Sequence, residues 1–254
     1  MSGFRAYCDF SAFSAGGEIP VGGAVELNAA ESRHLCGALR ARAGDIVDVF
    51  DAKGSAYRCE LAGASSKSAA LRVIGRLYPK SPEVEVYLAQ CLPKGPAFDE
   101  IIRQSVELGA SGIYPLMSCR SVVRLGRADA EKKSAKWFEK YVEAIKQSSN
   151  LSKFEMPPVS DISDFLSNSG GFEVKLVASL RENASPIYKV LKSAGVDFAK
   201  SACVLIGPEG DLSDAEYDAA ESAGFIPVKL GDNVMKCDTA AACALSVLKA
   251  FWQK

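Results

Sequence analysis

The 254-residue sequence contains a single histidine, His34, and eight scattered cysteines with no Cys-x-x-Cys pair. This excludes a metal site built from a His/Cys cluster, because such sites repeat their ligands at short spacings. No hydrophobic run approaches the length that spans a bilayer, and the first residues lack a basic segment followed by an apolar one. We therefore expect a cytoplasmic protein with reduced thiols, no bound metal and no membrane contact.

Neither sign of charge is in excess, since 30 Lys and Arg balance 31 Asp and Glu for a net charge of -1. The net charge of the whole chain therefore gives no indication of a nucleic-acid partner. The stretch from Arg120 to Lys153 differs, with nine Lys and Arg against four Asp and Glu. A local surplus of this kind can meet RNA phosphates, although a solvated helix face is the commoner explanation of such a stretch taken alone.

Residues 1–78 have the pattern of a small β-rich domain. Short runs rich in β-branched and aromatic residues alternate with turn residues, at a spacing typical of a small barrel. The predicted strands are residues 25–27, 45–50, 56–61 and 70–74, with a hairpin loop at 51–54 and one helix at 29–42. Pro79 and Pro82 interrupt the patterns on both sides and indicate a linker.

Residues 79–254 alternate strands and helices, which predicts an α/β domain with a parallel sheet and helices on both faces. The predicted strands are 84–92, 112–117, 174–180, 202–206 and 225–230, and the predicted helices are 97–109, 130–149, 185–194, 213–223 and 238–252. Ser213 and Glu216 have the spacing of a capping box, and Gly224 is placed to end that helix in a left-handed conformation.

Two glycine turns follow strands near the C-terminus. The first is Gly207-Pro208-Glu209-Gly210, and the second begins at Gly231. Neither has the spacing of the common nucleotide fingerprints, so phosphate cradling of the usual kind is not indicated. Because ligands bind at the carboxyl ends of strands in α/β sheets, the pair of turns predicts a small-molecule cofactor site.

The loop at residues 234–240 places Lys236 and Asp238 at the start of the last helix. As pure structure, Asp238 or Thr239 is a plausible N-cap, and the local pattern favours this interpretation. As chemistry, the same residues could orient a nucleobase or help remove a proton from a weakly acidic imide.

Cations elsewhere in the chain are candidates for contact with RNA. Arg33, His34, Arg40 and Arg42 cluster in the N-terminal region, and Lys94 lies beside a glycine at a predicted strand end. A lone histidine is more often a surface or packing residue than a catalyst. The cluster is nonetheless a credible RNA-facing patch.

Several segments, in order along the chain, resemble one known family. They are residues 31–35, 39–45 and 50–54, residues 92–95, 105–109 and 120–123, and residues 205–210, 223–225, 230–231 and 238–240. Together they resemble the 16S ribosomal RNA uridine-N3 methyltransferases of the SPOUT, or α/β-knot, class. Each segment is weak alone, but their co-occurrence in order is specific.

This resemblance implies a PUA-like β-barrel that binds RNA at residues 1–78, and a SPOUT α/β-knot methyltransferase domain at 79–254. It implies a homodimer acting on small-subunit ribosomal RNA, with S-adenosylmethionine bound by three loops of a C-terminal trefoil knot. The cofactor-binding residues are expected to be Leu180, Ile206, Gly207, Pro208, Glu209, Gly210, Leu230, Gly231, Val234, Met235, Thr239 and Ala240. Lys236 and Asp238 are the expected catalytic residues, and Arg33, His34, Arg40, Arg42, Lys94, Arg120 and Arg124 are expected to contact RNA.

The sequence departs from the family pattern at several positions. Asp211 stands where glycine is usual, Asn150, Asn233 and Lys236 where arginine is usual, and Asp238 where glutamate is usual. The related knotted enzymes that methylate ribose carry a Ser-Leu-Asn pattern where this chain has Asp238-Thr239-Ala240, which favours a base as the target. Two alternatives remain: a knotted methyltransferase acting on another RNA nucleotide, and a non-catalytic RNA-binding relative in ribosome assembly.

Overall fold

The structure is a computed structural model that describes residues 3–13, 18–51, 53–193 and 195–253. It divides into two compact units, Met1–Ser81 with Ile145–Lys153, and Pro82–Ala144 with Phe154–Lys254. The predicted ranges 1–78 and 79–254 did not anticipate that Ile145–Lys153 packs with the first unit. Ala52 in the predicted hairpin loop and residue 194 in a predicted helix lie outside the described residues.

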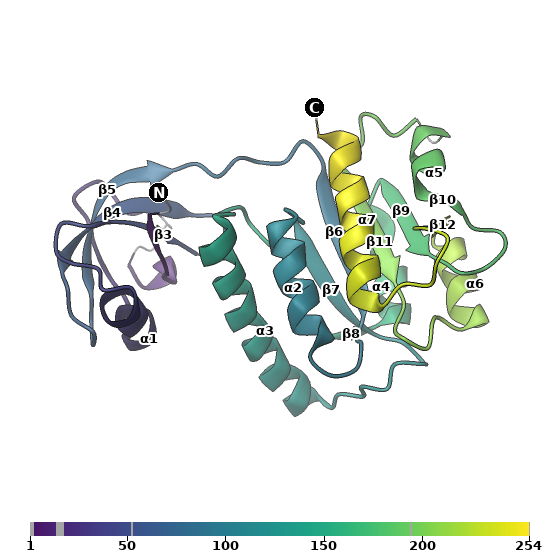
Figure 1. Cartoon of the computed structure of the whole chain (residues 1–254), viewed down its shortest axis with the longest axis horizontal. Coiled ribbons are helices and arrows are strands. Elements are labelled where there is room, and N and C mark those ends of the chain that lie inside the picture. The colour runs from purple at the N-terminus through teal and green to yellow at the C-terminus, as the bar shows by residue number, and fades with distance from the viewer. Residues whose placement is uncertain (1–2, 14–17, 52, 194, 254) are drawn as a thin grey trace. The chain divides into compact units, whose positions relative to one another are not determined.

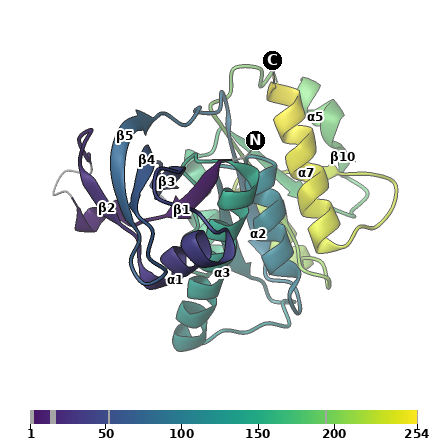
Figure 2. The same cartoon turned by 60° about the vertical axis from the view of Figure 1, so that its left-hand side comes forward.

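The N-terminal unit is built on a five-stranded mixed sheet (Figures 1 and 2). Its strands are β1 (Phe4–Tyr7), β2 (Ala24–Glu26), β3 (Ile46–Phe50), β4 (Ala56–Gly63) and β5 (Ala70–Leu77), in the order β1-β3-β4-β5-β2. The β1–β3 pair is parallel, and the β3–β4, β4–β5 and β2–β5 pairs are antiparallel. Val47, Val49, Leu71 and Val73 alternate with more exposed residues, so every second side chain enters one buried core. A short 3-10 turn, η1 (Phe10–Ala12), contributes Phe10 to that core.

The predicted helix at residues 29–42 is wrong beyond residue 38. Asn28 caps a short helix, α1 (Ala29–Ser32), which continues as a π-helical turn, η2 (Arg33–Ala38). Arg40 then adopts a left-handed backbone with φ of 58°, which ends the helix. The segment that carries the basic cluster is therefore a short helix and a turn.

A buried ion pair anchors Ile145–Lys153 within the N-terminal unit. Lys146 Nζ lies 2.8 Å from Glu31 Oε1, and the two side chains are only 15% and 12% exposed. Glu31 Oε2 also accepts a hydrogen bond from the Tyr7 backbone N–H at 3.0 Å. Arg5 donates to the Lys146 carbonyl at 2.8 Å. These contacts explain why a segment distant in sequence belongs to this unit.

The C-terminal unit contains a seven-stranded, fully parallel sheet. Its strands are β6 (Glu85–Cys91), β7 (Gly112–Met117), β8 (Ser160–Asp161), β9 (Val174–Ala178), β10 (Ser185–Pro186), β11 (Ser201–Ile206) and β12 (Ile226–Lys229), in the order β10-β12-β9-β11-β6-β7-β8. The five strands predicted for this region all occur, with shifted ends. Prediction missed β8 and β10, which have two residues each and therefore no readable alternation.

Helices cover both faces of this sheet, as predicted (Figure 1). They are α2 (Ala97–Glu107), α3 (Arg127–Ser148), α4 (Ile162–Ser167), α5 (Ile187–Ser193), α6 (Asp214–Ser222) and α7 (Cys237–Trp252), with a 3-10 turn η3 (Ser169–Gly171) after α4. Helices α2 and α7 lie side by side. Phe165 of α4 and Tyr217 of α6 share one core cluster with Cys203 and Leu205 of β11. Helix α4 was not predicted.

The helix termini show which local signals were read correctly. The capping box of Ser213 and Glu216 at the start of α6 is confirmed, and so is the left-handed Gly224 that follows, at φ of 89°. The N-cap prediction for α7 is wrong, because Lys236 occupies that position without a side-chain cap. Asp238 is instead the second residue of the helix, where its charge complements the helix dipole.

Two properties of the described residues bear on function. None of their helices combines the length and apolarity needed to cross a membrane. Within the same residues, no group of three or more His, Cys, Asp or Glu side chains is arranged to hold a metal ion.

Candidate functional site

A cavity of about 630 Å³ lies where β9, β11 and β12 end. Three loops line it, and they contribute residues 178–180, residues 206–209 with 211, and residues 228–237 with 240. Because the strands are parallel, their carboxyl ends meet at one edge of the sheet, which is where α/β sheets bind ligands. The volume falls within the range of pockets for drug-sized molecules.

The loop after β11 is a tight turn held from several sides. The Asp211 N–H donates to the Pro208 carbonyl at 2.9 Å. A Cβ atom on Gly207 would lie 3.3 Å from the Leu212 backbone nitrogen, so the close approach favours glycine there. Arg120 Nη1 donates to the carbonyls of Gly210 at 3.2 Å and Leu212 at 3.3 Å. The turn is therefore braced from outside the cavity.

The loop after β12 closes back onto the first turn. A Cβ atom on Gly231 would come 3.0 Å from Met235 Cε, so the missing side chain leaves room for the methionine. The Cys237 thiol lies 3.6 Å from the Gly207 carbonyl and links the two loops. Burial, together with the charges of Glu209 and Asp238, raises the pKa of Cys237 to about 11. This cysteine is therefore a neutral thiol near neutral pH.

The loop after β9 supplies the third wall. Ser179 N–H donates to the Val228 carbonyl at 2.9 Å, which continues the pairing of β9 with β12 one residue past the end of β9. Leu180 follows with 60% of its surface exposed, although it is a large apolar side chain at the cavity. An exposed apolar residue at a cavity mouth is suited to contact the flat face of a ligand.

Most of the residues predicted for a cofactor line this cavity. They are Leu180, Ile206, Gly207, Pro208, Glu209, Leu230, Gly231, Val234, Met235 and Ala240, together with Lys236 of the expected catalytic pair. Gly210, Thr239 and Asp238 are not among the lining residues.

The lining also includes residues that the sequence interpretation missed: Ala178, Ser179, Asp211, Val228, Lys229, Asp232, Asn233 and Cys237. Ser179 was not predicted as a site residue because the strand was expected to run to residue 180, whereas β9 ends at Ala178. Ala178 lies in the same strand, and the others flank the two glycine turns. Nearness to those turns was a signal for them, and Asp211 and Asn233 also stood out as departures from the family pattern.

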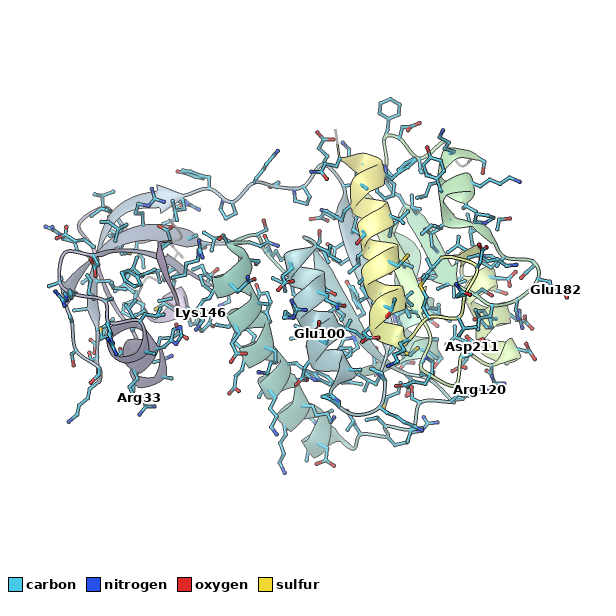
Figure 3. All side chains as sticks on the ribbon, in the orientation of Figure 1. Arg33, Glu100, Arg120, Lys146, Glu182 and Asp211 are labelled. Atoms are coloured by element: carbon cyan, nitrogen blue, oxygen red, sulfur yellow. The ribbon has the colours of Figure 1, made fainter. Side chains whose placement is uncertain are left out.

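Three of the predicted RNA-contacting cations gather around the first turn. The Lys94 N–H donates to Glu209 Oε1 at 2.9 Å, and Arg120 holds the turn carbonyls. Arg124 donates to the carbonyl of Cys119, next to Arg120, at 2.8 Å. Figure 3 shows Arg120 and Asp211 in the same part of the C-terminal unit. The Arg120 guanidinium therefore lies beside the cavity turn and Arg124 lies next to it, whereas Lys94 is tied to Glu209 through its backbone.

The other four predicted RNA contacts belong to the N-terminal unit. Arg33, His34, Arg40 and Arg42 are all exposed, on or just after the turn η2. The Arg42 N–H donates to Asp45 Oδ2 at 2.7 Å, which fixes the loop that presents this cluster.

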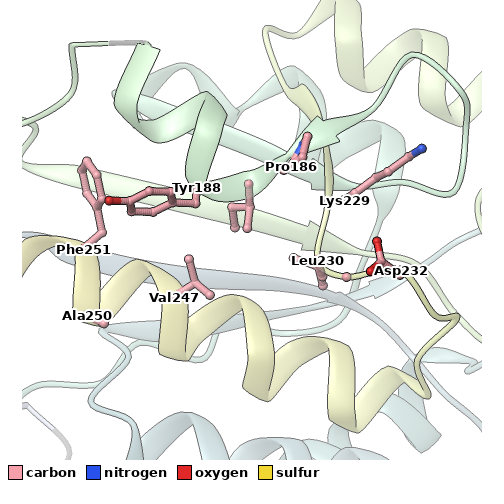
Figure 4. A pocket seen from close by; sticks show the side chains of 10 residues that line it. Pro186, Tyr188, Lys229, Leu230, Asp232, Val247, Ala250 and Phe251 are labelled. Carbon is pink, nitrogen blue, oxygen red and sulfur yellow. The ribbon is translucent and has the colours of Figure 1, made fainter.

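Figure 4 shows the residues that line a second cavity, of about 510 Å³. Residues 229–232 line both cavities. Its remaining wall comes from β10, from the start of α5 and from α7, where the rings of Tyr188 and Phe251 meet edge to face at 6.5 Å.

Comparison with known proteins gives the class of protein to which this fold and cavity belong. Residues 79–249 match the family described as an RNA methyltransferase domain, and residues 27–74 match an RNA methyltransferase PUA domain. The predicted fold class, a parallel α/β domain with an N-terminal PUA-like domain, is confirmed.

Individual relatives narrow this class. The chain is 29% identical over 229 residues to ribosomal RNA small subunit methyltransferase E of Bacillus subtilis, covering 86% of each chain. It is 30% identical to the protein of that name from Synechocystis, covering 89% of this chain and 73% of that one. The chain therefore belongs to the family of the ribosomal RNA small subunit methyltransferases E.

Solved structures agree with this assignment. The Neisseria gonorrhoeae ribosomal RNA small subunit methyltransferase E, bound to S-adenosyl methionine, is 26% identical with a TM-score of 0.85 and coverage of 98% of this chain and 97% of that one. A putative methyltransferase from Legionella pneumophila, in complex with bound SAM, is 25% identical with a TM-score of 0.86 and 98% coverage of both chains.

Proposed function

We propose that the protein uses S-adenosylmethionine to methylate a uridine at N3 in small-subunit (16S) ribosomal RNA. The main support is the cavity formed by three loops at the carboxyl ends of β9, β11 and β12, in a chain of the ribosomal RNA small subunit methyltransferase E family. The Legionella pneumophila and Neisseria gonorrhoeae structures with this fold are described as complexes with S-adenosylmethionine.

The residues of the cavity fit that cofactor. Leu180, Val234 and Met235 offer apolar surface for an adenine ring, while the glycines at 207 and 231 leave backbone groups accessible. Glu209 presents a carboxylate that can accept hydrogen bonds from ribose hydroxyls or an amine. The walls thus offer both an apolar cleft and polar groups at its edge.

When bound, S-adenosylmethionine supplies an electrophilic methyl group. The chain's own residues then have to hold a uracil and accept the proton of its N3–H. We assign the first task to Lys236, whose ammonium group can donate to a uracil carbonyl oxygen and stabilise the negative charge that develops on the imide. We assign the second task to the Asp238 carboxylate, which directly follows the lining residue Cys237 in the first turn of α7.

The remaining parts of the proposal concern RNA and assembly. We propose that the PUA-like unit at residues 1–78 and the cations Arg33, His34, Arg40, Arg42, Lys94, Arg120 and Arg124 hold the ribosomal RNA. We propose further that the C-terminal loops form a trefoil knot and that the enzyme acts in the cytoplasm as a homodimer. The Arg120 guanidinium beside the turn at residues 207–210 supports the RNA contact, because phosphates would meet positive charge next to the cavity.

Lys236→Ala and Asp238→Asn test the assigned roles. Both variants should bind S-adenosylmethionine within about threefold of the wild type in calorimetry, because neither side chain is expected to hold the cofactor. Methylation of small-subunit RNA should fall by roughly 10²-fold or more, the usual contribution of a positioned acid or base. Leu230→Arg, which places a long side chain in the cavity, should abolish binding and methylation together. If Lys236→Ala and Asp238→Asn methylate at the wild-type rate, the assigned roles are wrong.

A further inference from the structure

The residue that follows the first glycine turn, Asp211, has an unusual backbone for a residue with a side chain. Its φ is 60°, in the left-handed region that glycine adopts most readily. Its side chain lines the first cavity. A carboxylate held at a strained position on a binding cavity is a candidate for a role toward the ligand.

The Asp211 carboxylate is fixed by two hydrogen bonds to one of its oxygens. Oδ1 accepts from the Leu212 N–H at 2.8 Å and from the Tyr217 hydroxyl at 2.7 Å. Tyr217 is itself only 2% exposed, and its hydroxyl lies 3.3 Å from the carbonyl of Ala178, the last residue of β9. Among the residues that the structure describes, no hydrogen bond or ion pair reaches Oδ2. One oxygen is therefore anchored, while the charge remains available to the cavity.

Asp211 differs in this respect from the other charged side chains of the cavity. Glu209, Asp232, Lys229 and Lys236 also line the cavity, but all four are exposed, whereas Asp211 is half-buried. Water screens exposed charges strongly, and a fixed, partly buried charge keeps more of its field. Asp211 is thus the lining charge whose field is least screened by solvent.

We propose, on the basis of the methyltransferase function above, that Asp211 sets the selectivity of this pocket for the charged methyl donor over the demethylated product. S-adenosylmethionine carries a sulfonium cation, and loss of the methyl group leaves a neutral thioether, so S-adenosylhomocysteine has one positive charge fewer. A fixed carboxylate in the cavity attracts the donor and gains nothing from the product's sulfur. The residue would therefore favour release of the product and its replacement by fresh donor.

The expected size of the effect follows from Coulomb's law. Two unit charges about 6 Å apart, at an effective dielectric constant of about 40, interact strongly enough to change an affinity by on the order of tenfold. Screening by salt should reduce this preference, because the cavity opens to solvent at its exposed lining residues.

The test is calorimetric measurement of both dissociation constants, for S-adenosylmethionine and for S-adenosylhomocysteine, in the wild type and in Asp211→Asn. The amide keeps an oxygen that can accept from Leu212 and Tyr217 but carries no charge. We expect the donor to bind about three- to tenfold more weakly and the product to bind within twofold of the wild type. Asp211→Gly, which suits the left-handed backbone, should show the same loss of preference. Asp232→Asn, an exposed carboxylate of the same cavity, is the matched control and should change the ratio less than twofold.

An unchanged ratio of the two constants in both Asp211 variants would overturn the inference while leaving the cofactor assignment intact. If neither molecule bound the wild-type protein, the cofactor assignment itself would fail, and the inference would fail with it.

Discussion

At the scale of single residues, the cavity depends on close contacts between its loops and on a carboxylate whose position is fixed by hydrogen bonds. Gly207 and Gly231 leave space that a Cβ atom would fill, Asp211 is fixed by Tyr217, and Cys237 connects two loops through the Gly207 carbonyl. None of these contacts follows from composition. Each depends on which loops the fold brings to the same edge of the sheet.

The Cys237 thiol gives a residue-scale prediction. Because its pKa is raised to about 11 by burial and by the charges of Glu209 and Asp238, little thiolate exists near neutral pH. Alkylation of Cys237 by iodoacetamide, followed by mass spectrometry in the Cys119→Ser background that removes an exposed thiol, should be slow at pH 8 and accelerate toward pH 11. A rate that levels off before pH 9 would contradict the raised pKa.

At the scale of elements, helix α6 is the support of the first cavity loop. Its capping residue Glu216 accepts from the Ser213 N–H at 2.8 Å and from the Cys119 N–H at 2.7 Å. Burial acts to raise the pKa of Glu216, but hydrogen bonds from the backbone of Ser213 and Cys119 outweigh it, so the pKa lies below its ordinary value of 4.5. Ionised Glu216 therefore joins α6 to the segment after β7.

Glu216→Gln should lower the free energy of unfolding by about 1–2 kcal/mol at neutral pH, because two backbone donors lose a charged acceptor. A lowered carboxyl pKa stabilises the fold above the unfolded value near 4.5, and this contribution is lost as the pH falls through the folded value. Urea denaturation at a series of pH values should therefore show the difference from the wild type shrinking below pH 4.5.

The control for that series is Glu182→Gln, which removes an exposed carboxylate from the loop between β9 and β10. It should change the stability by less than about 0.5 kcal/mol at every pH. If the difference in unfolding free energy between Glu216→Gln and the wild type stayed constant from neutral to acid pH, ionisation of Glu216 would not contribute to stability.

The elements that could be predicted from the sequence are those with enough residues to show a period. Strand β11 with its five consecutive buried residues, and helix α6 with its capping box, were readable for this reason. The two-residue strands β8 and β10 depend on tertiary contacts that no pattern reports. The end of the helical segment at Ala38, two residues before the left-handed Arg40, depends on a backbone angle that no pattern reports either. The cavity was predictable at its glycine turns, whereas Ser179 and Asp211 were not, because their roles come from pairing with Val228 and Tyr217.

At the scale of the whole molecule, the chain forms two units that are not contiguous in sequence. Ile145–Lys153 belongs to the N-terminal unit, where the Glu31–Lys146 pair is nearly buried. Removing one partner of a buried ion pair costs stability, because the remaining charge stays desolvated and unpaired. The integrity of the N-terminal unit should therefore depend on a residue of the distant segment.

Lys146→Ala should lower the stability of the N-terminal unit by about 3 kcal/mol, the usual cost of leaving a buried charge unpaired. Lys140→Ala is the matched control, because Lys140 pairs with Glu143 at 2.9 Å through exposed side chains. That change should cost less than about 1 kcal/mol. Hydrogen exchange of strands β1 and β3 reports on this unit directly, and equal protection in the two variants would contradict the anchoring role of Lys146.

The most direct test of the proposed function is to locate the methyl group. Purified protein is incubated with 16S ribosomal RNA and S-adenosylmethionine that carries a deuterated methyl group, and the RNA is digested and analysed by mass spectrometry, with Lys236→Ala and Leu230→Arg in parallel. The proposal predicts deuterated N3-methyluridine at one position with the wild type and little or none with either variant. A methyl group on another nucleotide would contradict the assigned substrate, and no transfer by wild-type protein that binds the cofactor in calorimetry would contradict the proposed activity.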